Sequence, residues 1–339
     1  MGTVTSEAPY GGGGMTLRAA LAASVAVSLL VLPCAVEAQP IGRLLTVGIL
    51  ANEAWPPIDA FRQGLRALGY VEGQHVRFEY RYAEGHNDRF PGLAKELVAM
   101  RVDAIVTWGT DAALAAKNAT KTIPIVMGAI GDPIAAGAVE SLAHPGGNIT
   151  GLSALAGELE GKRLELLAEI LPTLSHVAVI VNPTNRYNAR SALPHARRGA
   201  VTLKLTLKVV EVHDAKTLSD AFALLTREPP QAILVLADPF VASQRQQLAE
   251  FALRARLPTA HTYREHVEAG GLVAYSPNYS DLFRRAAGYF NKIVHGAKPG
   301  DLPIEQPTKF DVILNLRTAK TLGLTIPQSL LLRADQIIE

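Results

Sequence analysis

Short apolar runs alternate with longer amphipathic segments from residue 44 to the C-terminus. The run Val177–Val181 is apolar at every position, as a strand buried on both faces of a parallel sheet requires. We expect strands at residues 44–51, 75–82, 104–107, 123–127, 176–182, 207–213, 232–236, 272–275 and 310–314. Helices are expected where apolar residues recur every three or four positions, at residues 58–68, 89–100, 157–171, 217–227, 242–256 and 279–295. This alternation predicts an α/β fold in which helices cover both faces of parallel sheets.

The pattern starts again after a glycine-rich stretch, the sequence PGGNITG at residues 145–151, which can act as a hinge. A chain of 339 residues also suggests two lobes, since one domain typically takes about 150 residues. Prolines at positions 299, 303 and 307 precede the last apolar run, residues 310–314. A tail of this kind suggests that the chain crosses between the lobes more than once, so neither lobe need be continuous in sequence.

The N-terminus has the pattern of a leader. An uncharged run covers residues 19–36, and small residues stand at the two positions that a signal peptidase would inspect before a cut between Ala38 and Gln39. A membrane anchor is the alternative, but a span needs about 20 apolar residues, and this run is shorter and interrupted by Pro33. We therefore predict that residues 1–38 are a leader and signal peptide and that the protein is periplasmic.

Composition narrows the class of protein. Apolar residues make up 48% and charged residues 19%, which favours a globular protein over extended disorder. Basic residues number 33 and acidic residues 31, scattered along the chain, so no nucleic-acid partner is expected. Cys34 is the single cysteine, which excludes an internal disulfide. Lipid attachment at Cys34 is the less favoured alternative to release, because a proline precedes it.

Polar and aromatic side chains follow the predicted strands, and ligands bind beyond the carboxyl ends of strands in an open α/β sheet. Trp55 and Trp108, the two tryptophans of the chain, both follow strands of the first unit, where they either contact a ligand or pack under loops. Tyr263, with Arg264 and Glu265, is a further candidate, although the charged pair is interpreted as solvated. The other candidates at strand ends are Thr110, Asp111, Asp132, Asn182, Tyr187, Asn188, Asp238 and Tyr275.

Several of these residues also fit a local role. Asp132 and Asp238 each precede a proline, an arrangement that suits a helix cap, and capping is the simpler explanation for either alone. Their recurrence in both units favours a joint role in ligand binding. Thr110 and Asp111 stand where a helix begins, so backbone N–H groups there would bind an anion such as a carboxylate, and a cap explains them almost as well.

Signatures of catalysis are missing from the sequence. It contains no Gly-x-Ser-x-Gly, Gly-x-x-x-x-Gly-Lys or His-Glu-x-x-His motif. The first strand leads into Asn52-Glu53-Ala54, without the glycines that admit a dinucleotide. His261 and His266 are five residues apart, do not share a helical face as metal ligands usually do, and are interpreted as surface or loop residues. We expect no cofactor and no metal, and a binding protein rather than an enzyme.

Three segments together resemble one protein family: FRQGLRALGYVEGQ at residues 61–74, PGGNITG at 145–151 and QPTKF at 306–310. With them, residues 44–339 resemble the extracytoplasmic substrate-binding components of ABC transporters, in particular the branch related to tryptophan/phenylalanine-binding proteins. The resemblance implies a type I periplasmic-binding fold, in which two Rossmann-like lobes are joined by three hinge strands. It also implies reversible capture of a small solute and its delivery to a membrane permease driven by a separate ATPase.

On this resemblance, residues 44–152 plus 276–308 form one lobe and residues 153–275 plus 309–339 the other, with Ser153 and Ser276 as hinge residues. The candidate residues would face an amino acid, with the tryptophans against its planar part, Asp132 or Asp238 near a cationic group, and the Thr110 turn near a carboxylate. Two other functions stay open: a secreted enzyme that uses Asp132 and Asp238 as an acid/base pair, and a sensory ligand-binding domain.

Overall fold

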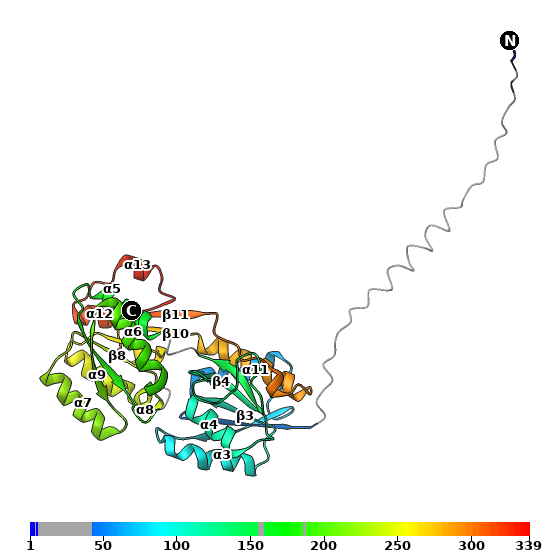
Figure 1. Cartoon of the computed structure of the whole chain (residues 1–339), viewed down its shortest axis with the longest axis horizontal. Coiled ribbons are helices and arrows are strands. Elements are labelled where there is room, and N and C mark those ends of the chain that lie inside the picture. Colours follow the sequence, from blue (N-terminus) through cyan, green and yellow to red (C-terminus); the bar gives the residue numbers. More distant parts are fainter. Residues whose placement is uncertain (4, 6–42, 155–158, 186–187) are drawn as a thin grey trace. The chain divides into compact units, whose positions relative to one another are not determined.

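The computed structural model describes residues 1–3, 5, 43–154, 159–185 and 188–339. From residue 45 onward these residues form two β-sheets with helices on their faces (Figure 1), which confirms the predicted α/β class. Nearly all of the predicted signal peptide, including Cys34, lies outside the described residues.

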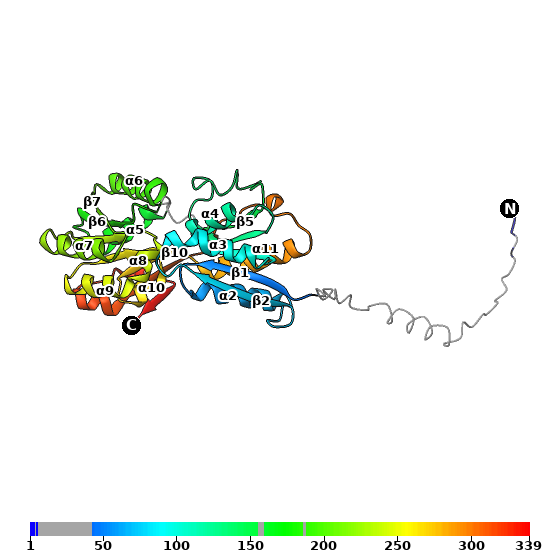
Figure 2. The ribbon, with the colours of Figure 1, turned by 90° about the horizontal axis from the view of Figure 1, so that it is seen from below.

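The first sheet has five parallel strands in the order β2-β1-β3-β4-β5, and β1 and β2 run side by side (Figure 2). Alternate side chains point to opposite faces, so Val47 and Ile49 pack in one core cluster and Leu50 in another. The strands are β1 Leu45–Ala51, β2 Val76–Tyr82, β3 Ala104–Trp108, β4 Ile125–Ile130 and β5 Ile149–Ser153.

Two pairs of helices cover this sheet. α2 (Pro56–Ala67) and α11 (Tyr279–Val294) pack against each other on one face, and α3 (Phe90–Ala99) and α4 (Thr110–Ala119) pack together on the other, with the 3-10 turn Asn87–Arg89 before α3. A Cβ added at Gly64 of α2 would lie 2.8 Å from the Cβ of Ala287, so glycine is what lets α2 and α11 approach so closely. A helix from late in the chain thus completes the core of the first sheet.

The second sheet has seven strands in the order β12-β11-β10-β9-β8-β6-β7. They are β6 His176–Val181, β7 Thr206–Glu211, β8 Ala232–Val235, β9 Thr259–His261, β10 Val273–Pro277, β11 Phe310–Asn315 and β12 Gln336–Ile338. β10 and β11 are antiparallel, whereas the other neighbours are parallel. Both sheets are thus predominantly parallel, as expected, and β11 runs against β10 because the chain returns to this sheet from the opposite end.

Helices also cover both faces of the second sheet. Val177 and Val179 pack in one cluster with residues of α5 and α6, whereas Ala178 and Ile180 pack in another with residues of α7 and α9. The helical elements are α5 Glu160–Ile170, α6 Leu193–Leu203, α7 Ala215–Arg227, α8 Pro239–Ser243, α9 Arg245–Arg254, α10 Arg264–Glu268, α12 Leu316–Leu322, α13 Gln328–Leu331, the π-helical turn Asn188–Ala192 and the 3-10 turn Pro299–Asp301.

The chain passes between the two sheets after β5, after β10 and before β11. Ser153 is the last residue of β5, and its backbone N–H donates to the carbonyl of Glu305, 2.9 Å away. Ser276 is the last residue but one of β10. Both predicted hinge residues thus stand where the chain leaves one sheet for the other, and their role in a hinge stays a prediction.

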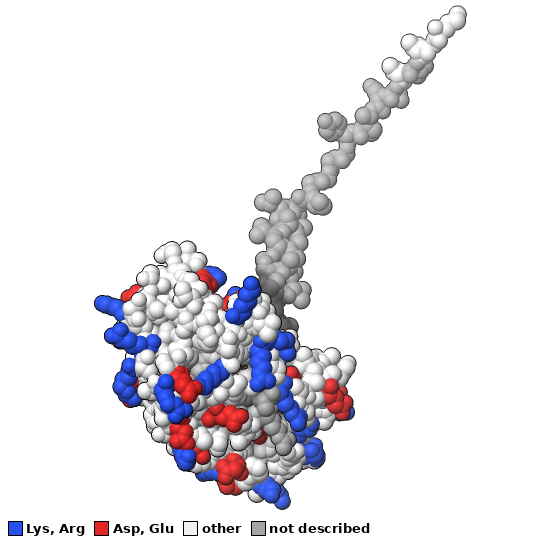
Figure 3. Space-filling model, turned by 60° about the vertical axis from the view of Figure 1, so that its left-hand side comes forward, with Lys and Arg blue, Asp and Glu red and all other residues white. Residues whose placement is uncertain are grey.

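Charged side chains of both signs are intermixed on the face shown in Figure 3. Exposed ion pairs such as Lys216 with Asp220, 2.7 Å apart, are typical of this surface. Pairs of this kind contribute little to stability, so we assign the fold to the packing of its sheets and helices.

Candidate ligand-binding site

A chamber lies between the carboxyl ends of strands from both sheets. The volume inside it that water molecules can occupy is about 40 Å³. From the first sheet and its helices it is lined by Phe90, Trp108, Gly109, Thr110, Asp111, Ala112, Ala129, Ile130, Gly131 and Ala154, and from the second sheet by Asn185, Ala237, Pro239 and Tyr263, with Tyr279 at the start of α11. This is the location that the strand-end rule for α/β sheets predicts for a ligand.

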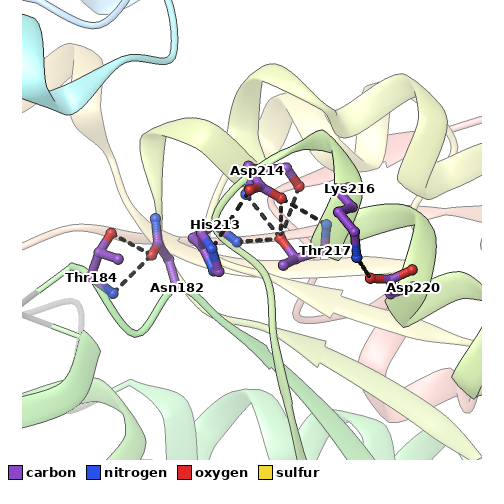
Figure 4. Close-up of polar contacts among 7 residues, drawn as sticks. All are labelled: Asn182, Thr184, His213, Asp214, Lys216, Thr217 and Asp220. Atoms are coloured by element: carbon purple, nitrogen blue, oxygen red, sulfur yellow. Dashed lines mark hydrogen bonds and ion pairs between the residues drawn. The ribbon is translucent and has the colours of Figure 1, made fainter.

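A wider mouth of about 610 Å³ shares Phe90 and Asp111 with the chamber and so continues it outward. Asn182 and Thr184 line the mouth. The Oδ1 atom of Asn182 accepts hydrogen bonds from the backbone N–H and the hydroxyl of Thr184, at 3.0 and 2.8 Å (Figure 4). Asn182 therefore lines this mouth while its carbonyl oxygen holds the turn after β6, and its contact with a ligand stays a prediction.

The two tryptophans stack on each other. Their ring centroids are 4.0 Å apart with an interplanar angle of 13°, and Trp55 is 7% and Trp108 6% exposed. Trp108 lines the chamber, whereas Trp55 does not and packs behind it. The indole N–H of Trp55 donates to Oε1 of Glu265, 2.8 Å away. The sequence left open whether these residues pack or contact a ligand, and the structure places Trp108 in a position to do both.

The turn from β3 into α4 supplies the polar wall of the chamber. Gly109 takes a φ of 88°, which directs the chain from the strand into the helix and puts Thr110 and Asp111 in its first turn. Nδ2 of Asn87 donates to Oδ2 of Asp111 at 2.9 Å. The chamber thus has a helix N-terminus and a carboxylate side by side, as the sequence predicted for these two residues.

Asp132 and Asp238 are not among the residues that line the chamber in the described part of the chain. Oδ1 of Asp132 accepts from the N–H groups of Ile134 and Ala135, at 3.1 and 2.9 Å. Asp238 caps α8 through the N–H of Val241, at 3.0 Å.

Asp238 is also enclosed by the protein. It is 1% exposed and accepts from Nδ2 of Asn185 at 2.9 Å. Burial raises the pKa of Asp238, and the hydrogen bond from Asn185 opposes that rise. Capping accounts for the contacts of Asp132 with Ile134 and Ala135, and for that of Asp238 with Val241 but not with Asn185.

The remaining predicted residues lie elsewhere. The ring of Tyr275 stacks on Phe310 with centroids 5.8 Å apart, and Tyr275 is not among the residues around the chamber or its mouth. Tyr187 and the side chain of Asn188 fall outside the described residues.

The larger side chains of the chamber wall that were not named as candidates from the sequence are Phe90, Asn185 and Tyr279, whereas Tyr263 was noted as a further candidate. The interpretation of Glu265 as a solvated residue is wrong. Its carboxyl lies against Trp55, and burial raises its pKa. Tyr279 begins an amphipathic helix two residues after the end of β10, and this position is the signal that could have found it.

A fully buried ion pair lies near the crossing from β5 to α5. Glu160 and Arg163 are both 0% exposed, and NH1 of Arg163 is 2.6 Å from Oε1 of Glu160. Nε of Arg163 also donates to the backbone carbonyl of Tyr275 in β10, at 2.9 Å. Burial raises the pKa of Glu160 to about 7, and the guanidinium of Arg163 opposes this rise.

His261 and His266 are buried, not surface residues, which corrects the interpretation from the sequence. They are 2% and 3% exposed, and their rings stack with centroids 4.7 Å apart. Burial, followed by the charge of Arg245, lowers the pKa of His266 to about 4. Among the described residues, no group of three His, Cys, Asp or Glu side chains is arranged to hold a metal ion.

The buried His266 predicts a loss of stability in acid. Because its pKa is about 4 in the folded protein and 6.5 as the reference value, the folded state favours the neutral ring. The stability that comes from burying the neutral His266 ring is fully present above pH 6.5 and is lost as the pH falls toward 4. His266→Phe should therefore hold its stability better in this range, by about 3 kcal/mol relative to the wild type. Denaturant unfolding at several pH values measures the difference, and the exposed His144→Gln is the control. Parallel pH curves for wild type and His266→Phe would contradict the prediction.

Comparison with known families shows what kind of protein this is. The family described as "ABC transporter substrate binding protein" matches residues 56–338. The chain belongs to this family. The resemblance noted in the sequence is thereby confirmed, and the protein is a substrate-binding protein of an ABC transporter.

Individual relatives agree. A "Tyrosine-binding protein" of Clostridioides difficile (strain R20291) is 28% identical over 284 residues, which cover 82% of this chain and 81% of the relative. A solved ABC domain from Streptococcus pneumonia in complex with L-Trp is 27% identical, with a TM-score of 0.81 over 87% of this chain and 100% of that one. A ligand-free, open substrate-binding protein with adhesive properties from Clostridium difficile is 25% identical, with a TM-score of 0.63 over 87% and 99%.

The two TM-scores differ although the identities and coverage are nearly the same. This substrate-binding protein therefore superposes better on the solved L-Trp complex than on the open, ligand-free relative. Among the described residues of this substrate-binding protein, no helix has the length and apolar character needed to cross a bilayer.

Proposed function

We propose that this substrate-binding protein captures an aromatic amino acid in the chamber between its two sheets and passes it, chemically unaltered, to a membrane permease driven by a separate ATPase. The proposal places the protein in the periplasm after removal of residues 1–38. The names of two relatives, one tyrosine-binding and one solved with L-Trp, support the choice of ligand.

The main observation behind this proposal is that the chamber wall offers a separate group to the carboxylate, the ammonium group and the aromatic side chain of an amino acid. The first turn of α4, at Thr110, offers backbone N–H groups to the α-carboxylate. The carboxylate of Asp111 would meet the α-ammonium group. The rings of Trp108, Tyr263 and Tyr279 would surround an aromatic side chain. These groups come from both sheets, so one ligand would contact both lobes.

The size of the chamber sets how capture would proceed. About 40 Å³ holds only a few water molecules, which is less than an aromatic amino acid needs. The ligand would therefore enter while the mouth is wider and be enclosed as the two sheets approach. A ligand favours the enclosed form only if it binds that form more tightly, which contact with both walls provides.

The enzyme alternative gains no support from the site. Asp132 and Asp238 each accept hydrogen bonds from the backbone of their own turn, and neither is among the described residues that line the chamber. An acid/base pair must reach the bound substrate, so these two carboxyls do not meet the geometric requirement.

Calorimetric titration with L-Tyr, L-Trp and L-Phe tests the proposed function, with the D-enantiomers as controls for the α-carbon contacts. We expect saturable binding of at least one L-amino acid, and mass spectrometry of the released ligand should find it unaltered. Failure of all three to bind, or chemical conversion of the ligand, would remove the proposal.

Asp111→Asn should lower the affinity of the bound amino acid by about 10- to 100-fold, because it removes the charge that meets the ammonium group. Asp132→Asn is the matched control. Its carboxyl accepts hydrogen bonds from the N–H groups of Ile134 and Ala135 in its own turn. Because asparagine caps turns in the same way, we expect the affinity of Asp132→Asn to be close to that of the wild type. Equal affinities for wild type and Asp111→Asn would assign the ammonium contact to another group.

A further inference from the structure

Trp55 has surroundings that its neighbours in the first loop do not share. Its ring stacks on Trp108 and meets Tyr263, Tyr279 and Phe283 edge-on, with centroid distances of 6.1, 4.9 and 5.8 Å. Trp55 follows a strand of the first sheet, whereas Tyr263 follows a strand of the second. One indole is thus held by rings from both lobes.

Trp55 also separates two spaces. The chamber lies on the side of Trp108, while Trp55 and Glu265 both line a groove of about 540 Å³ that continues along Pro56, Asn278 and Lys309. Tyr279 borders both spaces. The stacked pair of indoles therefore forms the wall between the chamber and the groove.

The only hydrogen-bonding group of the indole is its N–H, and it reaches a carboxylate on the opposite lobe. Glu265 lies in α10, which packs against β10 and β11 of the second sheet, and its Oε1 is 2.8 Å from Nε1 of Trp55. Two further contacts join the same loop to the second lobe: Nδ2 of Asn52 to the carbonyl of Pro239 at 3.3 Å, and Arg245 to Glu53 at 3.4 Å. Of these three contacts, the hydrogen bond from Trp55 to Glu265 is the shortest and is the one that aromatic rings enclose.

We propose that Trp55 and Glu265 form an interlobe latch, in which Glu265 is a positioning residue that holds Trp55 against Trp108 and thereby favours the enclosed form of the chamber. The latch rests on the proposed function only for its effect on affinity. Its effect on conformation is a property of the ligand-free protein. A ligand on the free face of Trp108 would then bind a wall whose other face is already fixed.

Four variants of the full-length protein separate the latch from a general effect on folding. Trp55→Phe keeps an aromatic ring for the stack but removes the donor, and Glu265→Leu removes the acceptor. Glu265→Gln keeps an acceptor oxygen in the same place. Glu268→Leu is the matched control, because Glu268 lies on the same helix, is 45% exposed and pairs with Arg264 instead.

The first measurement uses ligand-free protein in small-angle X-ray scattering. We expect a larger radius of gyration for Trp55→Phe and Glu265→Leu than for wild type, Glu265→Gln and Glu268→Leu. The second uses circular dichroism. The chain has two tryptophans, so exciton coupling between stacked indoles reports directly on Trp55 and Trp108. Glu265→Leu should lose this coupling and Glu265→Gln should keep it.

Affinity gives the third measurement, with whichever of L-Tyr, L-Trp and L-Phe binds the wild type. Loss of a hydrogen bond to a charged acceptor should weaken the apparent affinity by about tenfold or more in Trp55→Phe and Glu265→Leu. If the wild type binds none of these amino acids, the proposed function fails, while the scattering and dichroism still test the latch. An unchanged radius of gyration together with retained exciton coupling in Glu265→Leu would overturn it, as would a Glu265→Gln protein that behaves like Glu265→Leu.

Discussion

Replacing Arg163 with methionine should lower the free energy of unfolding by about 3–5 kcal/mol at pH 8. Arg163 and Glu160 are both fully buried, and the substitution leaves the Glu160 carboxylate in the core without its cation. It also removes the donor to the carbonyl of Tyr275. Denaturant unfolding followed by circular dichroism measures the loss.

The pH dependence of this loss has a definite sign. The folded-state pKa of Glu160, about 7, lies above the reference value of 4.5, so the folded protein favours the protonated acid, and without Arg163 this preference grows. The penalty in Arg163→Met should therefore increase as the pH rises above the folded-state pKa of about 7, by about 1 kcal/mol between pH 7 and pH 8, and be nearly constant below pH 6.

A double variant isolates the unpaired charge. Glu160→Leu combined with Arg163→Met replaces the pair by apolar side chains and should recover most of the lost stability. A single variant within about 1 kcal/mol of the wild type at pH 8 would show that the carboxylate finds another partner or water.

Gly151→Ala should be more damaging still, with a loss of more than about 4 kcal/mol or failure to fold. Gly151 has a φ of 132° and pairs with Met127 across β4 and β5. A Cβ at this position would lie 2.2 Å from the carbonyl oxygen and 2.6 Å from the nitrogen of Met127. Neither contact can be relieved by rotating a side chain, because both atoms belong to the backbone, so the strands would have to part.

Gly147→Asn is the control for Gly151→Ala. Gly147 also has a positive φ, 64°, but a Cβ there would meet no atom within 4 Å, and asparagine tolerates this left-handed region. We expect a cost of about 1 kcal/mol or less. Soluble expression and thermal unfolding compare the two variants. A Gly151→Ala protein that unfolds at the temperature of the wild type would refute the close approach of β4 and β5.

The elements predicted best from the sequence are those whose burial gives a long, regular pattern of apolar residues. β6 and its neighbours are continuous apolar runs, and α11 has a clear amphipathic period, so both were found within a few residues. β5 was expected to be part of a break, because Gly151 and its flanking glycines are typical of turns. In the fold the same glycine is what allows a strand to lie close to β4. The start of α4 at Thr110 was predicted but its extent was not, because its sequence TDAALAAKNA is rich in alanine and carries little apolar periodicity.

The candidate site was predicted in part for a similar reason. The residues after β3, including Trp108 and Asp111, depend only on where that strand ends, and the sequence gives this directly. Tyr263 and Tyr279 reach the chamber because the chain crosses between the sheets, and a position near a strand end does not by itself show which strand ends meet. The sequence predicted Asp238 as a site residue from its residue type and its position after a strand. In the structure its carboxyl accepts hydrogen bonds from the N–H of Val241, which it caps, and from Asn185.

The contribution of α11 to the first core has a consequence for synthesis. This helix begins at Tyr279 and buries eight side chains, among them Phe283 and Phe290, the second of which meets Phe61 with ring centroids 6.4 Å apart. A ribosome releases the chain from its N-terminus, so β1 and α2 must wait for about two hundred further residues before α11 completes this face of the core. Contacts so far apart in sequence also slow folding. The core of the first sheet thus stays incomplete until near the end of translation, and the nascent chain is unfolded there for most of its synthesis.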